Sequence, residues 1–196
     1  MNLNEFNSLV DLFFYQAEKE KSHTPFLEWL NPKNKKKFTW GETSSNIYKL
    51  AKTLRTNIVD GDRCLLVSEN RPEWLISDLA IMLANGVTVP AYTTYTENDY
   101  KYLIEDCQPS VIIVSNNEMH KKLKNIIKEK VFIKKVITFD KIEGVNGKKY
   151  LDFDSILNKK LLENEKIKNK NILKLKNVID PYSGISIPVE VCVLGE

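Results

Sequence analysis

The side chains best able to do chemistry in this 196-residue sequence are two histidines and three cysteines. His23 and His120 lie far apart, with no paired nucleophile or ligand motif nearby, so both are expected to be surface histidines. Cys64, Cys107 and Cys192 are odd in number and widely spaced. This pattern excludes a disulfide framework and zinc-ligand spacing, and it predicts reduced core cysteines in a cytoplasmic protein.

No standard catalytic or phosphate-binding motif is present in the sequence. It has no GxGxxG, Walker, HExxH or GxSxG pattern and no cluster of metal ligands. A net charge of +3 with 28% charged residues is too balanced to indicate nucleic-acid binding. Because no apolar run approaches the ~18 residues of a membrane span and no signal-peptide pattern occurs, a soluble protein without a transmembrane segment is expected.

The elements that must position any functional side chain alternate between strands and helices from about residue 60 to residue 139. Four short apolar runs predict strands covered on both faces, at 64–67, 87–89, 111–114 and 136–139. Apolar residues at helical spacing predict helices between these strands and also at 6–14 and 39–54. The alternation predicts an α/β fold with a parallel-dominated sheet and helices on both faces.

Helix-capping signals support these boundaries. Thr39 with Glu42 and Thr96 with Asp99 have the spacing of capping boxes. Asn70, followed by Pro72, and Asn116 or Asn117 are expected to begin two further helices. The segment 74–83 is apolar nearly all round, which predicts a helix buried between layers, whereas the lysine-rich segment 158–176 is expected to be a solvated helix or linker.

The turns at the carboxyl ends of the predicted strands are where such sheets bind ligands. They read SENRPEW, PAYTTYTEND and SNNEM. None has the glycine-rich form that brings backbone amides to a phosphate group. The fold class alone therefore gives no function.

Three segments in this order resemble the first subdomain of the adenylate-forming enzymes. They are FTWGETSSNIYKLAKTL, DGDRCLLVSENRPEWLISDLAIMLANGVTVPAY and YLIEDCQPSVIIVSN. The superfamily contains acyl-CoA synthetases, luciferases and the adenylation domains of peptide synthetases. SENRPEW with VTVPAYTTYT is most similar to the long-chain fatty acyl-CoA synthetases, although Thr93 stands where relatives often have proline. The resemblance covers about residues 12–176.

This resemblance implies a ligase that works in two steps. ATP and a fatty acid give an acyl-adenylate and pyrophosphate, and coenzyme A then displaces AMP to form the thioester. ATP, Mg²⁺ and coenzyme A are thus implied for the intact enzyme. The family holds the phosphates with a Ser/Thr/Gly-rich loop ending in Pro-Lys-Gly, and a mobile C-terminal domain supplies a catalytic lysine. The resemblance assigns no catalytic residue and no metal ligand within this sequence.

The family's phosphate loop would fall near Tyr182, where the sequence echoes it incompletely. Four residues follow the order of the loop, one residue short: Ser183, Gly184, Ser186 and Pro188. Val189 and Glu190 stand where the family has lysine and glycine, and a carboxylate there repels triphosphate. Either this segment is a degenerate phosphate loop or the likeness arises by chance in an unrelated tail.

The resemblance divides the chain into a partial AMP-binding N-terminal domain, residues 1–176, and a divergent tail, residues 177–196. Two functions remain open. The chain is expected to be the N-terminal fragment of an AMP-forming long-chain fatty acid:CoA ligase, inactive alone, with the remainder or a neighbouring polypeptide as partner. The alternative is a non-catalytic α/β module that docks a partner protein. A flavodoxin-like regulator is disfavoured, because the strand ends lack an acidic cluster or a phosphate-binding turn.

Overall fold

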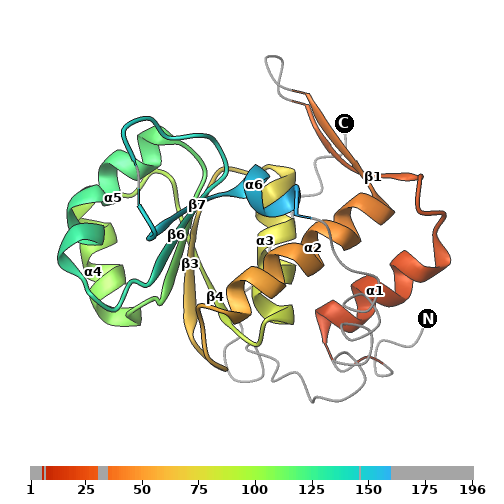
Figure 1. The fold of residues 1–196 in the computed structure, drawn as a ribbon, viewed down its shortest axis with the longest axis horizontal. Helices are drawn as coiled ribbons and strands as arrows, with labels where there is room; N and C mark the ends of the chain where they lie inside the picture. Colours follow the sequence, from red (N-terminus) through yellow and green to blue (C-terminus); the bar gives the residue numbers. More distant parts are fainter. Residues whose placement is uncertain (1–5, 7, 31–34, 146, 160–196) are drawn as a thin grey trace.

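A five-stranded parallel sheet forms the centre of the molecule, with helices on both faces and a separate two-stranded hairpin to one side (Figure 1). The structure is a computed structural model and describes residues 6, 8–30, 35–145 and 147–159. The tail and the segment 160–176, for which the sequence makes predictions, lie outside the described residues. Among the described residues no helix is both long and apolar enough to cross a bilayer.

The sheet has the order β4-β3-β5-β6-β7, and every neighbouring pair is parallel. Its strands are β3 (Arg63–Val67), β4 (Val87–Ala91), β5 (Val111–Val114), β6 (Lys135–Thr138) and β7 (Tyr150–Asp152). The four strands predicted from apolar runs are confirmed as β3 to β6. β7 was not predicted, because its three residues are only partly buried and give no apolar run.

Two layers of helices cover the sheet. α1 (Leu9–Lys19), α2 (Trp40–Arg55), α3 (Pro72–Leu83) and the short α6 (Phe153–Leu157) lie on one side, and α4 (Glu97–Cys107) and α5 (Asn117–Glu129) on the other (Figure 1). The period-two geometry of a strand divides the core between them. In β3, Cys64 and Leu66 pack toward α2 and α3, while Leu65 and Val67 pack toward α4 and α5, and all four are fully buried.

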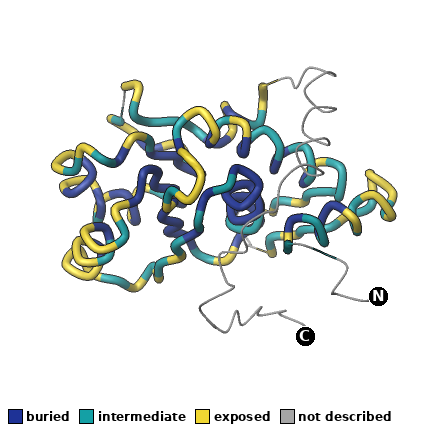
Figure 2. Tube along the Cα trace, turned by 90° about the horizontal axis from the view of Figure 1, so that it is seen from below, coloured by how far each residue is buried: buried dark blue, intermediate teal, exposed yellow. Residues whose placement is uncertain are grey.

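The helix α3 is the most completely buried, as its apolar sequence predicts. Ten of its twelve residues are buried, although Trp74 and Leu75 are only partly covered. Buried residues run through the centre of the molecule between the layers (Figure 2). The predicted cap Asn70 is wrong: Arg71 is the N-cap of α3, and it makes no side-chain capping bond. The predicted capping boxes at Thr39 and Thr96 and the Asn116 cap are confirmed.

The hairpin consists of β1 (Pro25–Trp29) and β2 (Lys36–Thr39), which pair antiparallel. The sequence did not predict these strands, because their residues are exposed or only partly buried and lack clear alternation. The hairpin leads directly into α2, and Gly41 at the start of that helix donates from its backbone N–H to the carbonyl of Ser22 at 2.9 Å. A Cβ atom at position 41 would lie 2.9 Å from the same oxygen, so this close approach requires glycine.

His120 corrects another expectation. It was predicted to be a surface histidine, but its side chain is buried in α5, and its Nε2 atom lies 3.2 Å from the hydroxyl of Tyr150 on β7. Covering by the edge strand β7, which the sequence did not reveal, accounts for the difference. His23 is exposed, as expected. Cys64 is buried and Cys107 half-buried, and both are free thiols.

Candidate functional site

The carboxyl edge of the sheet has a topological switch point between β3 and β5. The chain passes from β3 to β4 through α3 on one face, and then returns past β3 to β5 through α4 on the other face. In doubly wound sheets the diverging loops at such a point leave a crevice where ligands bind. This edge is therefore the part of the described structure to test for a functional site.

Three loops meet there and are joined by backbone hydrogen bonds. Ser115, which follows β5, donates from its N–H to the carbonyl of Val67 at 3.0 Å. Asp140, which follows β6, donates from its N–H to the carbonyl of Ser115 at 2.9 Å. The loop after β3 continues through Glu69 to Arg71 at the start of α3. These hydrogen bonds fix the backbone positions from which the side chains of the loops extend.

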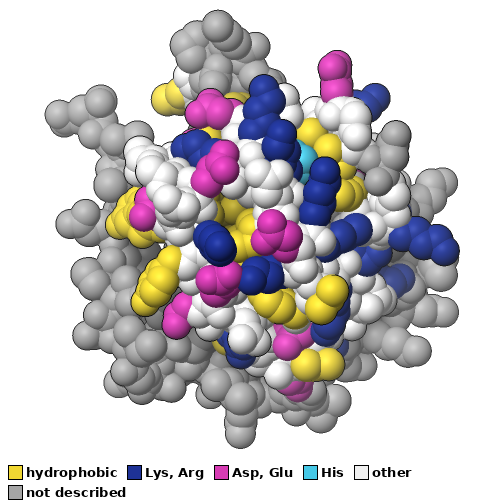
Figure 3. All heavy atoms as spheres, turned by 90° about the vertical axis from the view of Figure 1, so that its left-hand side faces the viewer, with side chains coloured by type: hydrophobic (Ala, Val, Ile, Leu, Met, Phe, Trp, Pro, Cys, Tyr) yellow, Lys and Arg dark blue, Asp and Glu magenta, His cyan; other side chains and the backbone are white. Residues whose placement is uncertain are grey.

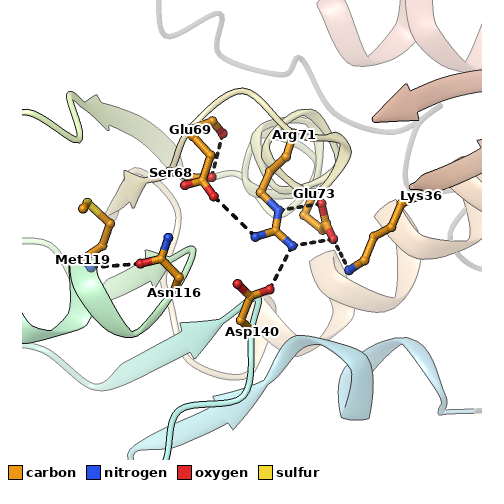
Figure 4. Close-up of polar contacts among 8 residues, drawn as sticks. All are labelled: Lys36, Ser68, Glu69, Arg71, Glu73, Asn116, Met119 and Asp140. Atoms are coloured by element: carbon orange, nitrogen blue, oxygen red, sulfur yellow. Dashed lines mark hydrogen bonds and ion pairs between the residues drawn. The ribbon is translucent and has the colours of Figure 1, made fainter. Parts of the chain in front are cut away.

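Arg71 projects into this edge and is surrounded by carboxylates (Figure 4). Its Nε and Nη2 atoms donate to the two carboxylate oxygens of Glu73 at 2.9 and 3.0 Å. Nη2 also donates to Asp140 at 3.0 Å, and Nη1 lies 3.6 Å from Glu69. The Arg71 side chain has no solvent exposure. A buried guanidinium held in this way is a fixed structural charge and not a mobile ligand-binding group.

The hairpin contributes to the same cluster. Lys36 of β2 donates to Glu73 at 2.5 Å, and its side chain is one-quarter exposed. The guanidinium carbon of Arg71 lies 4.6 Å from the ring centre of Trp29 and 5.4 Å from that of Phe139, both within cation–π range. The ion cluster of Lys36, Arg71, Glu73 and Asp140 therefore joins the hairpin, α3 and β6.

The shifts in pKa of Glu73 and Arg71 favour the charged form of both groups. Burial alone would raise the pKa of Glu73, but hydrogen bonds from Arg71 and Lys36 and the guanidinium charge hold it below its ordinary value. Burial alone would lower the pKa of Arg71, but hydrogen bonds and charges from Glu73 and Asp140 raise it. Two cations thus face two carboxylates, with a third, Glu69, nearby. The cluster has no positive charge left to attract a triphosphate.

The helix N-termini at this edge are also occupied. Thr96 accepts from the N–H of Asp99 and Asn116 from that of Met119, so side chains already cap α4 and α5. At α3 the first turn carries its own carboxylate, Glu73. A helix N-terminus binds an anion through these same amide groups. The residues present here therefore do not fit the phosphates of ATP. Nor do the described residues contain a group of three or more acidic, cysteine or histidine side chains able to hold a metal ion.

The ion cluster was not identified from the sequence, which placed the candidate site residues in the tail. Ser183, Gly184, Ser186 and Pro188 lie outside the described residues. One feature of the sequence could have indicated the cluster. Two opposite charges, Arg71 and Glu73, flank Pro72 at the start of an otherwise apolar helix. Such charges are buried only when paired, but their distant partners Lys36 and Asp140 cannot be recognised from spacing.

The family model described as "AMP-binding enzyme" matches residues 13–181, most of the chain. The chain belongs to this family. Other members of this family are therefore the appropriate comparison for the switch-point edge of this chain. In this chain the described part of that edge carries the Lys36–Arg71–Glu73–Asp140 cluster.

Curated relatives of the chain in the AMP-binding family include several fatty acyl-CoA ligases. It is 31% identical over 119 residues to the long-chain-fatty-acid–CoA ligase of Bacillus subtilis, covering 60% of this chain and 20% of that protein. It is 27% identical over 105 residues to long chain acyl-CoA synthetase 3 of Arabidopsis thaliana, covering 53% of this chain and 16% of that protein. The matched segments thus span a fifth or less of these relatives.

Solved structures of the family share the fold. The acetoacetyl-CoA synthetase from Streptomyces lividans matches with a TM-score of 0.68 at 16% identity, covering 77% of this chain and 25% of that one. An anthranilate CoA ligase crystallised with anthranoyl-AMP matches with a TM-score of 0.65 at 18% identity, covering 76% of this chain and 27% of that one. The predicted fold class, a parallel-dominated α/β sheet resembling the N-terminal domain of adenylate-forming enzymes, is confirmed.

Proposed function

We propose that this chain forms the first subdomain of a cytoplasmic AMP-forming long-chain fatty acid:CoA ligase and has no ligase activity alone. The family match over residues 13–181 carries this proposal. The names of the B. subtilis and A. thaliana relatives support a fatty acid as the substrate of the complete enzyme. ATP, Mg²⁺ and coenzyme A would be the co-substrates and metal of that complete enzyme.

The charge balance at the switch-point edge supports inactivity of the chain alone. Phosphoryl chemistry requires cations aimed at the charge that develops on the phosphate oxygens. Arg71 and Lys36 at this edge are already paired with Glu73 and Asp140. The subdomain would then provide a scaffold against which a phosphate loop and later motifs are placed. The division into residues 1–176 and a tail, 177–196, is part of this proposal.

An assay of pyrophosphate release tests the absence of activity. The purified chain with ATP, Mg²⁺, palmitate and coenzyme A is expected to release no more pyrophosphate than a reaction without palmitate, and to form no palmitoyl-CoA. Addition of the polypeptide that carries the remaining family motifs is expected to restore both products. Palmitoyl-CoA synthesis by the chain alone, free of host synthetase, would contradict the proposal.

Nucleotide binding tests the tail. We expect ATP with Mg²⁺ to bind no better than millimolar, because Ile185 and Ile187 resist the positive φ angles of phosphate loops and Pro188 has no N–H. Val189 and Glu190 remove a cation and add an anion. Calorimetric titration measures this affinity. A micromolar dissociation constant that is lost on deleting residues 182–196 would identify a working nucleotide site.

A non-catalytic module that docks a partner protein is the second candidate. The internally neutralised ion cluster favours it, because the buried pair of Arg71 and Glu73 is suited to structural support. The nucleotide sequence that follows the codon for Glu196 separates the two candidates. A reading frame that carries the family's later motifs supports the ligase, and an unrelated gene or intergenic sequence supports the module.

A further inference from the structure

One face of the molecule, on the side of α5 and the β6–β7 turn, carries a group of lysines with few acidic neighbours. On α5, Lys121, Lys124 and Lys128 are exposed and fall at i, i+3 and i+7, so they lie on one stripe of the helix. In the part of the chain that the structure describes, none of the three has an ion-pair partner. They are three like charges on one stripe, and Glu118 lies one turn before Lys121.

The lysines of the β6–β7 turn continue this stripe. Lys149 donates from its Nζ atom to the carbonyl of Ile127, which places the turn beside α5. Lys135 of β6 donates to the carbonyl of Lys148 in the same turn. Burial lowers the pKa of His120, and the charge of Lys124 lowers it further. The charge of Lys124 therefore acts on the side of α5 that contacts β7. The five side chains that we call the lysine face are Lys121, Lys124, Lys128, Lys148 and Lys149.

The two glutamates of α5 lie toward one flank of the lysine stripe, and the β6–β7 connection carries one exposed glutamate, Glu143. At 100° per residue, Glu118 and Glu129 fall about 60–140° around the helix from the lysine stripe. That direction leads to α4, because Lys122 on the same flank donates to the carbonyls of Thr93 and Tyr95 just before α4. Viewed from this side, basic side chains predominate toward one border of the surface (Figure 3).

An exposed apolar residue ends the lysine stripe. Val131, directly after the C-cap of α5, is 95% exposed, the most exposed of the large hydrophobic side chains among the described residues. An exposed aliphatic side chain close in sequence to lysines is suited to enter the interfacial region of a lipid bilayer. An acidic peptide would need a groove or a long strand edge, whereas β7 at this side has only three residues.

We propose that the lysine face, with Val131 at its end, docks on an anionic phospholipid bilayer. The face contains lysines and no arginine, and the compact lysine charge suits attraction to a field of headgroups without fixed geometry. Charge complementarity thus favours a bilayer as the occupant. The inference is independent of the proposed ligase function, because it concerns the helical layer remote from the ion cluster.

Vesicle co-sedimentation of the full chain tests the proposal. Vesicles of phosphatidylcholine with about 30% phosphatidylserine are expected to bind the chain, and the binding is expected to fall as salt rises. Vesicles of pure phosphatidylcholine are expected not to bind it. The triple variant Lys121→Gln, Lys124→Gln, Lys128→Gln is expected to lower the partition coefficient on the order of 100-fold. These substitutions are exposed, so circular dichroism and thermal unfolding should remain unchanged.

A matched triple variant controls for net charge. Lys19→Gln, Lys21→Gln and Lys35→Gln removes the same charge from exposed positions near α1 and the hairpin, and should bind like the wild type. Equal losses in both variants, or no binding to phosphatidylserine vesicles, would overturn the proposal. It would also be overturned if polyuridylate RNA or polyglutamate bound through the same three lysines while vesicles did not.

Discussion

At the scale of single residues, Arg71 has the largest structural consequence in the described part of the chain. Its guanidinium is fully buried and contacts carboxylates from α3 and the β6 loop, and the ring of Trp29 from the hairpin. Removing one partner from a buried ion cluster leaves the others desolvated and unpaired. The stability of three elements therefore depends on one side chain.

We predict that Arg71→Met lowers the free energy of unfolding by about 3–5 kcal/mol, because Glu73 would remain buried with only Lys36 as its cation. Urea denaturation followed by circular dichroism measures the change. Lys37→Met is the control: its ion pair with Glu28 is exposed on both sides, so its loss should cost less than about 1 kcal/mol. Equal effects of the two variants would show that the cluster does not stabilise the fold.

His120 gives a pH dependence with a defined sign. Burial first, and then the charge of Lys124, lowers the pKa of His120 in the folded state. As the pH falls, the unfolded chain therefore binds the proton before the folded chain does. The stability that neutral His120 contributes is complete above the pKa of the unfolded state, about 6.5. It is lost as the pH falls below that pKa toward the lower pKa of the folded state. We predict that His120→Gln loses less stability than the wild type between about pH 7 and pH 5. Urea denaturation across this range tests the prediction, and parallel curves would contradict it.

At the scale of elements, local capping determines where the helices begin. Thr96 and Asp99 form a reciprocal capping box at the start of α4. We predict that Thr96→Ala lowers the free energy of unfolding by about 1 kcal/mol, because the N–H of Asp99 loses its acceptor. Thr94→Ala, in the same loop but exposed, should leave stability within about 0.5 kcal/mol. Thermal unfolding distinguishes the two, and a larger loss at position 94 would contradict this account.

The elements also show what the sequence could predict and why. The central strands were predictable because burial on both faces demands an uninterrupted apolar run such as VIIV in β5. The hairpin was not, since its strands are half-covered and carry lysines and glutamate. Asn70 was the better cap by residue type, but the buried pairing of Arg71 with Glu73 determined the start of α3. The ion cluster depends on contacts 37 and 69 residues apart, which no local pattern encodes.

At the scale of the whole molecule, two cores share one sheet. One lies between the sheet and α1, α2 and α3, and the other between the sheet and α4 and α5. β3 and β5 are covered by both, and they have strand neighbours on both sides. The β1–β2 hairpin packs against the edge of the first core through Phe26, Leu27 and Phe38. It has only two strands, an arrangement that is marginal without tertiary contacts.

We predict a gradient of amide hydrogen exchange from this arrangement. The amides of Leu65 and Ile113, in β3 and β5, should exchange at the rate of global unfolding, whereas those of Leu27 and Lys37 in the hairpin should exchange through local opening. Exchange followed by NMR resolves these rates. In Arg71→Met the hairpin amides should exchange faster still, relative to the central strands. Equal protection of hairpin and centre would show that the molecule opens only as a single unit.

The cluster that joins the hairpin, α3 and β6 also has a consequence for synthesis on the ribosome. Translation produces Lys36, Arg71 and Glu73 first, and Asp140 follows Arg71 by 69 residues. At about 5–20 residues per second, this interval is roughly 3–14 s. During that time the hairpin and α3 can associate through Lys36 with Glu73 and through Trp29 with Arg71, while Arg71 lacks its partner from β6. The growing chain therefore exposes a hydrated, half-paired ion cluster until the fourth strand of the sheet is made.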